Sequence, residues 1–318
     1  MAKVLITGGA GYIGSHIAHD LADAGHHVRI LDDFSNGLAE RIKRFTDIHR
    51  INILDREAVV KAVEGMDSVI HLAAKKAVGE SVENPLKYYQ NNVGGTLNLL
   101  AAMSLHGVRR IVFSSTAAVY APSEKDAISE GDPTEPLSPY GATKLLSEEL
   151  IRTIGKAEGW SSISLRYFNV VGAGSPDLGD NSKDNLVPKV FQALENGSNP
   201  EIYGDDYPTP DGTCIRDYIH VSDLSNSHIS ALEAISNSQI NETYNVGSGI
   251  GYSVREVIDQ IERTIGKSTG AKVVSRRAGD SPKLISNIDH ISRDLGWRPR
   301  LSLQEMVDSA WLAWNSRT

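Results

Sequence analysis

The chain of 318 residues contains a single cysteine, Cys214. One thiol cannot form an intrachain disulfide or a cysteine-based metal site, and such scarcity is typical of proteins from a reducing cytosol. We therefore expect a cytoplasmic protein and predict no metal site.

Long basic runs and long hydrophobic runs are also missing. The formal net charge is −8 and the pI is near 5.7, whereas nucleic-acid binders normally present a basic face. No stretch approaches the ~18 consecutive apolar residues that span a bilayer. The first seven residues read as a short strand and not as a secretory signal. The sequence thus predicts a soluble protein with no nucleic-acid or membrane partner.

Strand and helix patterns alternate through the first half of the chain. Alternation of this kind indicates βαβ units and a parallel sheet with helices on both faces. The predicted fold class is α/β, a Rossmann-type doubly wound parallel sheet with a smaller α/β substrate-binding part. Strands are predicted at residues 3–7, 27–31, 50–53, 68–71, 110–113 and 162–166, and helices at 13–24, 57–63, 85–106 and 139–158.

The composition changes after about residue 170, where two loops are rich in Gly, Ser, Asp and Pro. Long polar loops tend to form ligand-facing surfaces. We predict a sheet domain over residues 1–170 and a smaller, loop-rich domain over 171–318, with segments after about 215 able to return to the first. Ser253 before a helix at 254–265, and a capping box of Ser302 and Glu305, mark later helix starts.

Gly8, Gly11 and Gly14 belong to a segment that follows the first strand and opens the first helix. Glycines there permit a tight turn and close approach of a pyrophosphate, and the helix N-terminus supplies unpaired N–H groups. The spacing is GxxGxxG instead of the usual GxGxxG, and a ligand-free turn is the alternative. Asp32 ends the second strand, where a carboxylate can bind an adenosine ribose and repel a 2′-phosphate. This favours NAD over NADP; the alternative is that Asp32 or Asp33 caps a turn.

Tyr140 and Lys144 lie four positions apart near the start of the predicted helix at 139–158, which places them on one helical face. A nearby cation, joined by a positive nicotinamide, favours the phenolate and would lower the pKa of the tyrosine toward working pH. Thr116 follows the strand at 110–113, and ligands of open α/β sheets bind outside such carboxyl ends. Alone, Tyr-x-x-x-Lys is a common coincidence; the upstream glycines make it a predicted hydride-transfer site.

Together these motifs resemble the extended short-chain dehydrogenases/reductases, and within them the UDP-glucose 4-epimerase family. The resemblance runs over nearly the whole chain. The segments that carry it are KAVGES at 76–81, YYQNNV at 88–93, RYFN at 166–169, Asn185-Leu186, GDDYPT at 204–209, RDYIHV at 216–221 and LGW at 295–297.

The resemblance implies that UDP-glucose and UDP-galactose interconvert by transient oxidation at C4 with tightly bound NAD. Tyr140 would then act as base and acid at the sugar 4-hydroxyl, with Lys144 holding the nicotinamide ribose and Thr116 assisting. A homodimer through helices of the sheet domain is also implied, to which Leu146, Leu150 and Ile154 could contribute, although such a stripe is more often core.

The resemblance also implies two sets of binding residues. Those for the cofactor are Gly8, Gly11, Tyr12, Ile13, Gly14, Asp32, Asp33, Asn36, Asn52, Ile53, Lys76, Asn92, Ser114, Tyr140, Lys144 and Tyr167. Those for the UDP-hexose are Lys76, Thr116, Tyr140, Asn169, Asn185, Leu186, Arg216, Arg276, Asp280 and Leu284. Arginine suits a diphosphate because the guanidinium offers charge and several donors at once. Without the resemblance, Arg276 and Arg277 would be read as a solvated surface pair.

Two positions depart from the family pattern. Asn52 stands where the family has an acid that reaches the adenine amino group. Leu284 stands at the sugar-pocket gate, where epimerases confined to glucose and galactose have a bulky aromatic and broader ones a smaller residue. Leucine is intermediate in size, so the resemblance leaves open whether N-acetylhexosamine substrates are accepted.

Enzymes with the same fold but other functions differ in the residues that follow the position of Thr116. Dehydratases and decarboxylases resemble this family but keep an acid after the Ser/Thr, whereas Thr116 is followed by two alanines. Elimination is therefore disfavoured, while a UDP-glucuronate 4-epimerase stays open. A non-catalytic NAD-sensing protein would be free to lose Tyr140 or Lys144, and both are present.

Overall fold

The computed structural model describes residues 1–277 and 279–317, and the chain divides into two compact units. The first unit comprises Met1–Ala121, Pro133–Tyr167 and Ser225–Tyr244. The second comprises Pro122–Asp132, Phe168–Leu224 and the chain from Asn245 on.

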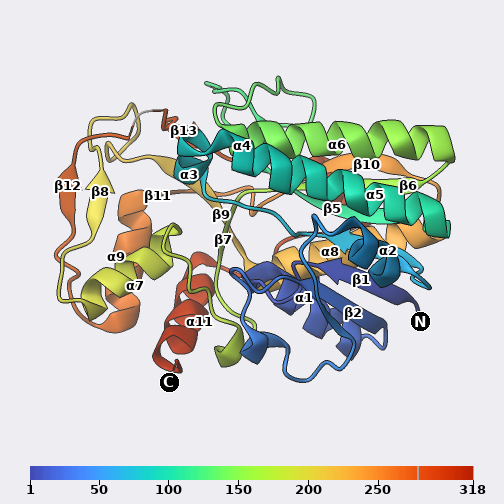
Figure 1. Ribbon diagram of the computed structural model, residues 1–318. Helices are drawn as coiled ribbons and strands as arrows, with labels where there is room; N and C mark the ends of the chain where they lie inside the picture. Colours follow the sequence, from blue (N-terminus) through green and yellow to red (C-terminus); the bar gives the residue numbers. More distant parts are fainter. Residues whose placement is uncertain (278, 318) are drawn as a thin grey trace. The chain divides into compact units, whose positions relative to one another are not determined.

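A seven-stranded sheet forms the centre of the first unit, in the order β10-β6-β5-β4-β1-β2-β3 (Figure 1). The pairs from β6 across to β3 are all parallel. Chain order reverses between β1 and β4, and in doubly wound sheets ligands bind at the carboxyl ends beside such a reversal. The strands are β1 Lys3–Thr7, β2 His27–Asp32, β3 Ile48–Arg50, β4 Ser68–His71, β5 Arg110–Thr116, β6 Ser161–Tyr167 and β10 Asn241–Val246.

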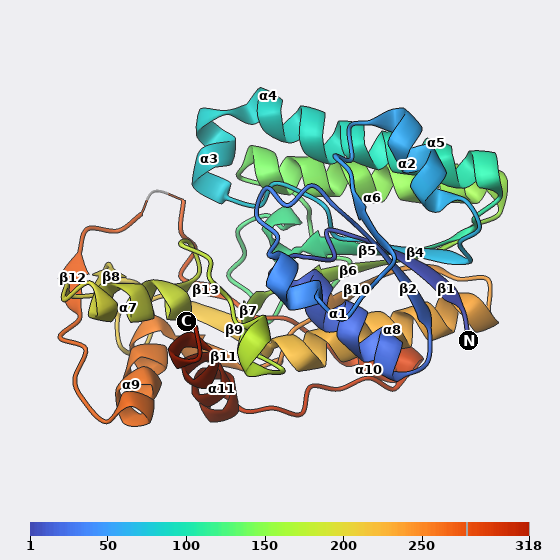
Figure 2. The ribbon, with the colours of Figure 1, turned by 60° about the horizontal axis from the view of Figure 1, so that its bottom comes forward.

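Helices cover both faces of this sheet, which confirms the predicted fold class. Figure 2 shows α2, α5 and α6 on one face and α1 and α8 on the other. The bounds are α1 Tyr12–Asp23, α2 Arg56–Val63, α3 Val78–Glu83, α4 Pro85–Tyr88, α5 Gly95–His106, α6 Pro139–Glu158 and α8 Val221–Asn237. The single helix predicted at 85–106 is α4 and α5 joined by a π-helical stretch, Tyr89–Gly94.

The strand predicted at 50–53 is wrong in position. The strand is Ile48–Arg50, and the chain then turns. Asn52 Oδ1 accepts a hydrogen bond from the backbone N–H of Leu54 at 2.9 Å, and this bond between near neighbours stabilises the turn. Ile53 points into the core with 5% of its surface exposed.

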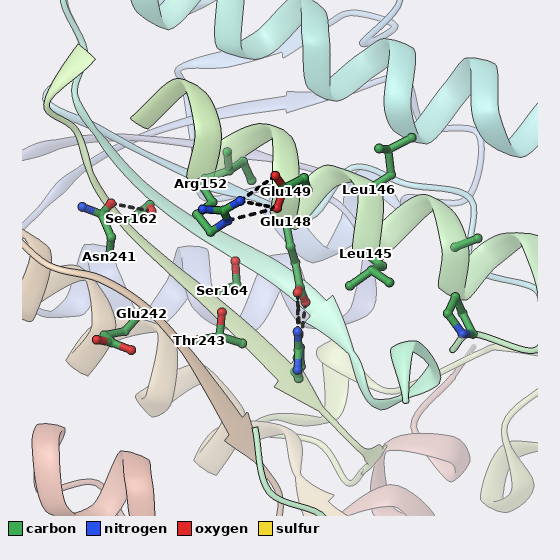
Figure 3. Close-up of a pocket in the computed structure, with 14 residues that line it drawn as sticks. Leu145, Leu146, Glu148, Glu149, Arg152, Ser162, Ser164, Asn241, Glu242 and Thr243 are labelled. Carbon is green, nitrogen blue, oxygen red and sulfur yellow. Dashed lines mark hydrogen bonds and ion pairs between the residues drawn. The ribbon is translucent and has the colours of Figure 1, made fainter. Parts of the chain in front are cut away.

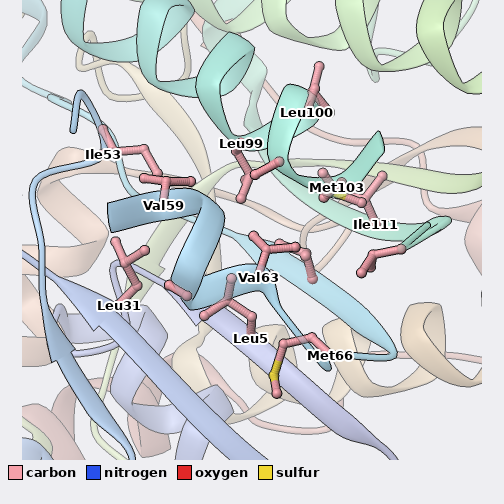
Figure 4. Packing of buried hydrophobic residues seen from close by; sticks show 14 of the residues in the cluster. Leu5, Leu31, Ile53, Val59, Val63, Met66, Leu99, Leu100, Met103 and Ile111 are labelled. Carbon is pink, nitrogen blue, oxygen red and sulfur yellow. The ribbon is translucent and has the colours of Figure 1, made fainter. Parts of the chain in front are cut away.

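The core between the sheet and α2, α5 and α6 is built from aliphatic side chains (Figure 4). Leu5 on β1, Val63 on α2 and Leu99 on α5 are fully buried in it. Parallel strands buried on both faces need such continuous apolar runs, and β1 and β4 have them.

The second unit contains a small sheet in the order β11-β9-β13, in which β7 also pairs with β9, and a separate pair, β8 with β12. Asp217 on β9 is fully buried, and its carboxylate accepts the N–H groups of Ser248 at 2.7 Å and Ser286 at 3.1 Å, so it ties three segments together. The strands are β7 Asn169–Val171, β8 Glu201–Tyr203, β9 Ile215–His220, β11 Gly251–Ser253, β12 Lys272–Val274 and β13 Lys283–Leu284.

Two helices of the second unit, α9 and α11, begin where the sequence predicts. Ser302 and Glu305 form the expected capping box of α11, and Ser253 forms a second one with Glu256. The bounds are α7 Leu186–Glu195, α9 Val254–Ile265, α10 Asp289–Leu295 and α11 Leu303–Asn315. Among the described residues, no helix combines the length and the apolar character that crossing a bilayer requires.

Truncating Leu5 to alanine should destabilise the protein, because it removes a fully buried side chain from the middle of the sheet. The expected loss in free energy of unfolding is about 3 kcal/mol. Leu312→Ala is the matched control, since that leucine is 59% exposed on α11. Urea denaturation followed by circular dichroism measures both, and equal losses for the two variants would contradict the packing described here.

Candidate active site

The glycine turn after β1 is shaped by close backbone approaches. Gly8 has φ +74°, and a Cβ placed on it would lie 2.9 Å from the backbone nitrogen of Ala73. A Cβ on Gly14 would lie 2.2 Å from the carbonyl oxygen of Gly8. Neither position can therefore carry a side chain. Gly11 is the N-cap of α1 and has no side-chain cap, so the helix N-terminus is open to an anion.

Asp32 connects the end of β2 to this turn. Its carboxylate accepts the N–H of Ala10 at 2.9 Å and of Phe34 at 2.8 Å. Burial raises the pKa of Asp32, and these two hydrogen bonds oppose that rise. A carboxylate has about four acceptor positions, so Asp32 both shapes the turn and retains acceptor capacity for a ribose.

Thr116, Tyr140 and Lys144 come together at the carboxyl end of β5. Thr116 is the last residue of β5, and its hydroxyl shares a hydrogen bond with the hydroxyl of Tyr140. Ser138 caps α6 by accepting the N–H of Gly141 at 3.2 Å, which places Tyr140 in the first turn. Lys144 Nζ donates to the carbonyl oxygen of Ser114 at 2.8 Å.

Burial determines the protonation of these groups. It raises the pKa of Tyr140 to about 12, partly offset by the hydrogen bond with Thr116. It lowers the pKa of Lys144 to about 8, against the opposing charge of Glu148. The lowering of the tyrosine pKa predicted from the lysine together with a positive nicotinamide stays a prediction, and it would have to offset the desolvation of a buried phenolate.

Hydroxyl and amide groups surround this centre. Ser114 lies against two rings: its Oγ is 2.8 Å from His228 Nε2, and it shares a hydrogen bond with the hydroxyl of Tyr167. Asn92 is 3% exposed and donates to Thr143 Oγ1 at 3.0 Å.

His71 is a fully buried residue that the sequence analysis missed. It ends β4, with Nδ1 2.6 Å from Thr7 Oγ1 and Nε2 3.1 Å from Thr96 Oγ1. Burial and the charge of Lys144 lower its pKa to about 3, so it stays neutral. Nothing in the sequence around it distinguishes a histidine at a strand end from an ordinary core residue.

A buried ion pair lies one turn beyond Lys144. Arg166 NH2 donates to Glu148 Oε2 at 2.7 Å, and each side chain is 8% exposed. Ser115 Oγ donates to the same carboxylate, so the pair joins α6, β6 and the end of β5. Both residues of the pair line a cavity of about 550 Å³ between α6 and strands β6 and β10, in which Figure 3 labels Glu148.

The predicted UDP contacts from Asn169 onward all lie in the second unit. Arg216 NH1 donates to the carbonyl oxygen of Ser281 at 2.8 Å, and NH2 lies 3.4 Å from Asp280 Oδ1. Leu284 pairs with Arg216 in neighbouring strands, so the structure brings these three predicted residues together.

The other predicted residues of this unit occupy nearby loops and helix starts. Arg276 Nε donates to Asp206 Oδ1 at 2.5 Å, and its guanidinium lies 4.1 Å from the ring centroid of Tyr207. Asn185 caps α7, with Leu186 as the first helical residue, and Asn185 Nδ2 donates to Asp180 Oδ2 at 2.6 Å. Asn169 begins β7 and is exposed.

These features define a Rossmann-type dinucleotide-binding enzyme with a buried tyrosine–lysine pair at the carboxyl end of its sheet. The model of the NAD dependent epimerase/dehydratase family matches residues 4–247. The chain belongs to that family.

Relatives and solved structures agree with this assignment. UDP-glucose 4-epimerase of Bacillus subtilis is 43% identical over 98% of this chain and 96% of its own length. The mouse UDP-glucose 4-epimerase is 40% identical over 98% of this chain and 96% of its own length. UDP-glucose-4-epimerase from Stenotrophomonas maltophila, with bound NAD and formylated UDP-arabinopyranose, superposes with a TM-score of 0.95 at 36% identity, covering 99% and 98%. The UDP-Glc/GlcNAc 4-epimerase from Campylobacter jejuni gives 0.87 at 36% identity, covering 99% and 100%.

Replacing Glu148 by glutamine should destabilise the protein, because Arg166 is left charged and buried without its partner. We expect a loss of about 3 kcal/mol in free energy of unfolding. The neighbouring Glu149 pairs with Arg152 on the surface, so Glu149→Gln should cost at most about 0.5 kcal/mol. Thermal and urea unfolding of both variants measure this, and a tolerated Glu148→Gln would show that the ion pair contributes little.

Proposed function

We propose that this chain interconverts UDP-glucose and UDP-galactose by transient oxidation at C4 of the hexose, with tightly bound NAD. The buried arrangement of Thr116, Tyr140 and Lys144 at the end of β5 is the observation that carries the proposal. Identity of about 40% over nearly the whole chain to proteins named UDP-glucose 4-epimerase supports the choice of sugar nucleotide.

The cofactor fits the first unit. Side chains are excluded at Gly8 and Gly14, where the backbone must approach a pyrophosphate, and Asp32 can accept from a ribose. The remaining cofactor contacts predicted from the sequence lie in the same unit. Asn36 and Lys76 are exposed there, whereas Ile53 is a core residue. When bound, NAD accepts the hydrogen from C4 as hydride, returns it, and adds a positive nicotinamide ring.

Tyr140 would remove the proton of the sugar 4-hydroxyl and later return it. The burial that raises its pKa makes it a strong base once ionised, and the charge of Lys144 would favour ionisation. Thr116 would orient the phenol through their shared hydrogen bond. Hydride returns to the opposite face of the 4-keto sugar, so net redox is zero and the cofactor has no need to leave.

Elimination chemistry is disfavoured at this site. The residues after Thr116 are Ala117 and Ala118, which have no acidic group to expel water. The Glu148 carboxylate is bound by Arg166 and Ser115 instead of being presented to a substrate. A dehydratase is therefore a poorer candidate than an epimerase.

The UDP moiety would be held by residues of the second unit. Arg216 and Arg276 would bind the diphosphate, each already oriented by a neighbouring carboxylate, Asp280 and Asp206. The other contacts we propose are Asn169, Asn185 and Leu186. Leu284, next to Arg216 in the sheet, would border the hexose. Its intermediate size is compatible with an N-acetyl group, and the structurally similar Campylobacter jejuni protein is named a UDP-Glc/GlcNAc 4-epimerase.

We further propose a homodimer through α5 and α6. Leu97 and Leu105 on α5 and Leu146 on α6 are 45%, 68% and 41% exposed, and the two helices lie side by side in both views (Figures 1 and 2). Leu150 and Ile154 pack against the core, so only Leu146 of the predicted stripe faces outward. In the proposed dimer, these exposed leucines would pack against the same leucines of a second copy of the chain. The cytoplasmic location stays a prediction from the single cysteine.

Replacing Leu97 and Leu105 together by glutamate should produce a monomer, because charges would be buried against a like surface. Size-exclusion chromatography with light scattering measures this against a wild-type mass of about two chains. Leu312→Glu, on an exposed site of the second unit, is the control and should remain dimeric. A wild-type monomer would remove the dimer from the proposal.

Purified NAD-containing protein should convert UDP-galactose to UDP-glucose. Testing UDP-N-acetylgalactosamine in parallel shows whether a site bordered by Leu284 also accepts N-acetylated sugars. Tyr140→Phe should lower kcat by roughly 10²–10⁴-fold, the usual contribution of acid–base catalysis, while NAD content stays at the wild-type level. Failure of the wild type to convert UDP-galactose would refute the function. Near-normal turnover by Tyr140→Phe would remove the tyrosine from the chemistry.

A further inference from the structure

Lys75 crosses the glycine turn, and neither the motifs nor the proposed chemistry uses it. Its ammonium donates a hydrogen bond to Ser35 Oγ at 2.9 Å. Lys75 follows β4 and Ser35 follows β2, and β1 lies between these strands in the sheet. The bond therefore spans the turn that follows β1, which is the turn that contains Gly8 and Gly11.

The backbone of Lys75 is held in place by one amide. Asn92 Oδ1 accepts the N–H of Lys75 at 2.8 Å, and Asn92 Nδ2 donates to the carbonyl oxygen of Lys75 at 3.0 Å. The same amide nitrogen donates to Thr143, the residue before Lys144. The lysine backbone is thus tied to α6, and only its side chain needs to move to open the bond with Ser35.

The other end of the bond is held by a strained loop. Phe34 has φ +57°, a left-handed conformation that is unusual and unfavourable for a bulky residue. Hydrogen bonds from the N–H of Phe34 to Asp32 and from the N–H of Ser35 to Asp33, both 2.8 Å, maintain it. Strain that the surroundings maintain in this way is typical of ligand-binding loops.

A role in charge balance alone does not account for this arrangement. Asp32 and Asp33 are close enough for the charge of Lys75 to lower the pKa of each, against the effect of burial. The hydrogen-bond partner of the ammonium is nevertheless the neutral hydroxyl of Ser35. That geometry extends the cation over the turn where a pyrophosphate would bind.

We propose that Lys75 and Ser35 form a latch across the dinucleotide site, with the Lys75 ammonium set against the pyrophosphate of bound NAD, and that this latch slows release of the cofactor. The inference rests on the NAD dependence of the family and is independent of which sugar is used. A catalyst that regenerates its cofactor in every cycle gains from slow release, because each loss costs a rebinding step.

Dissociation of labelled NAD from the holoenzyme into excess unlabelled NAD tests the latch. Lys75→Met should release NAD roughly 10-fold faster, the range of a lost charge-assisted hydrogen bond. Raising the salt concentration should accelerate release from the wild type toward the variant rate and leave the variant unchanged. Lys61→Met removes the same charge from an exposed site on α2 and should match the wild type.

Two further variants keep the test decisive if Lys75→Met folds poorly. Lys75→Arg retains the charge and should keep release slow, while Ser35→Ala should accelerate it by a few fold without altering the lysine. In the double variant Lys75→Met/Ser35→Ala the two effects should not add, since both break one bond. The latch would be overturned if Lys75→Met released NAD at the wild-type rate, or if the two substitutions increased the release rate additively in the double variant. The latch is judged by the rate of NAD release and the epimerase proposal by conversion of UDP-galactose by the wild-type holoenzyme, so the failure of one is distinguishable from the failure of the other.

Discussion

The buried ammonium of Lys144 is the constraint on which the site depends. A charged group removed from water is costly unless its surroundings compensate it. The carbonyl oxygen of Ser114 at 2.8 Å, the ring of Phe113 with its centroid 4.8 Å from Nζ, and the charge of Glu148 provide that compensation. The pKa still falls to about 8, so the lysine remains charged at neutral pH but only by a small margin.

Buried polar side chains near Lys144 are connected to one another by hydrogen bonds. Glu148 and Arg166 neutralise each other, and Ser115 connects them to the strand that carries Thr116. His71 stays neutral and adds no second cation beside the lysine. Asn92 connects the same helix to Lys75 on the cofactor side. The proposed catalytic groups and the proposed latch are thus connected to one helix, α6, which is why a change in that helix is expected to affect both.

Local patterns predicted most of the fold correctly. The alternation of apolar strands and helical spacing identified the parallel sheet, and two serine caps marked helix starts because capping depends on residues three positions apart. The strand at 48–50 was displaced in the prediction because Ile51 and Ile53 look like strand residues, whereas Ile53 belongs to the core beyond a turn. The burial that raises the tyrosine pKa could not be read from the sequence, because it depends on packing between distant segments.

The sequence by itself determined the glycine turn, the Tyr140–Lys144 spacing and the absence of an acid after Thr116, since each depends on residues close together in the chain. Tertiary structure alone decided which distant residues meet them. His71, Glu148 with Arg166, and Lys75 with Ser35 are separated in sequence from their partners by strands and helices, and only sheet order brings them together. Burial depends on that same packing, and it therefore decided the protonation states of Tyr140 and Lys144.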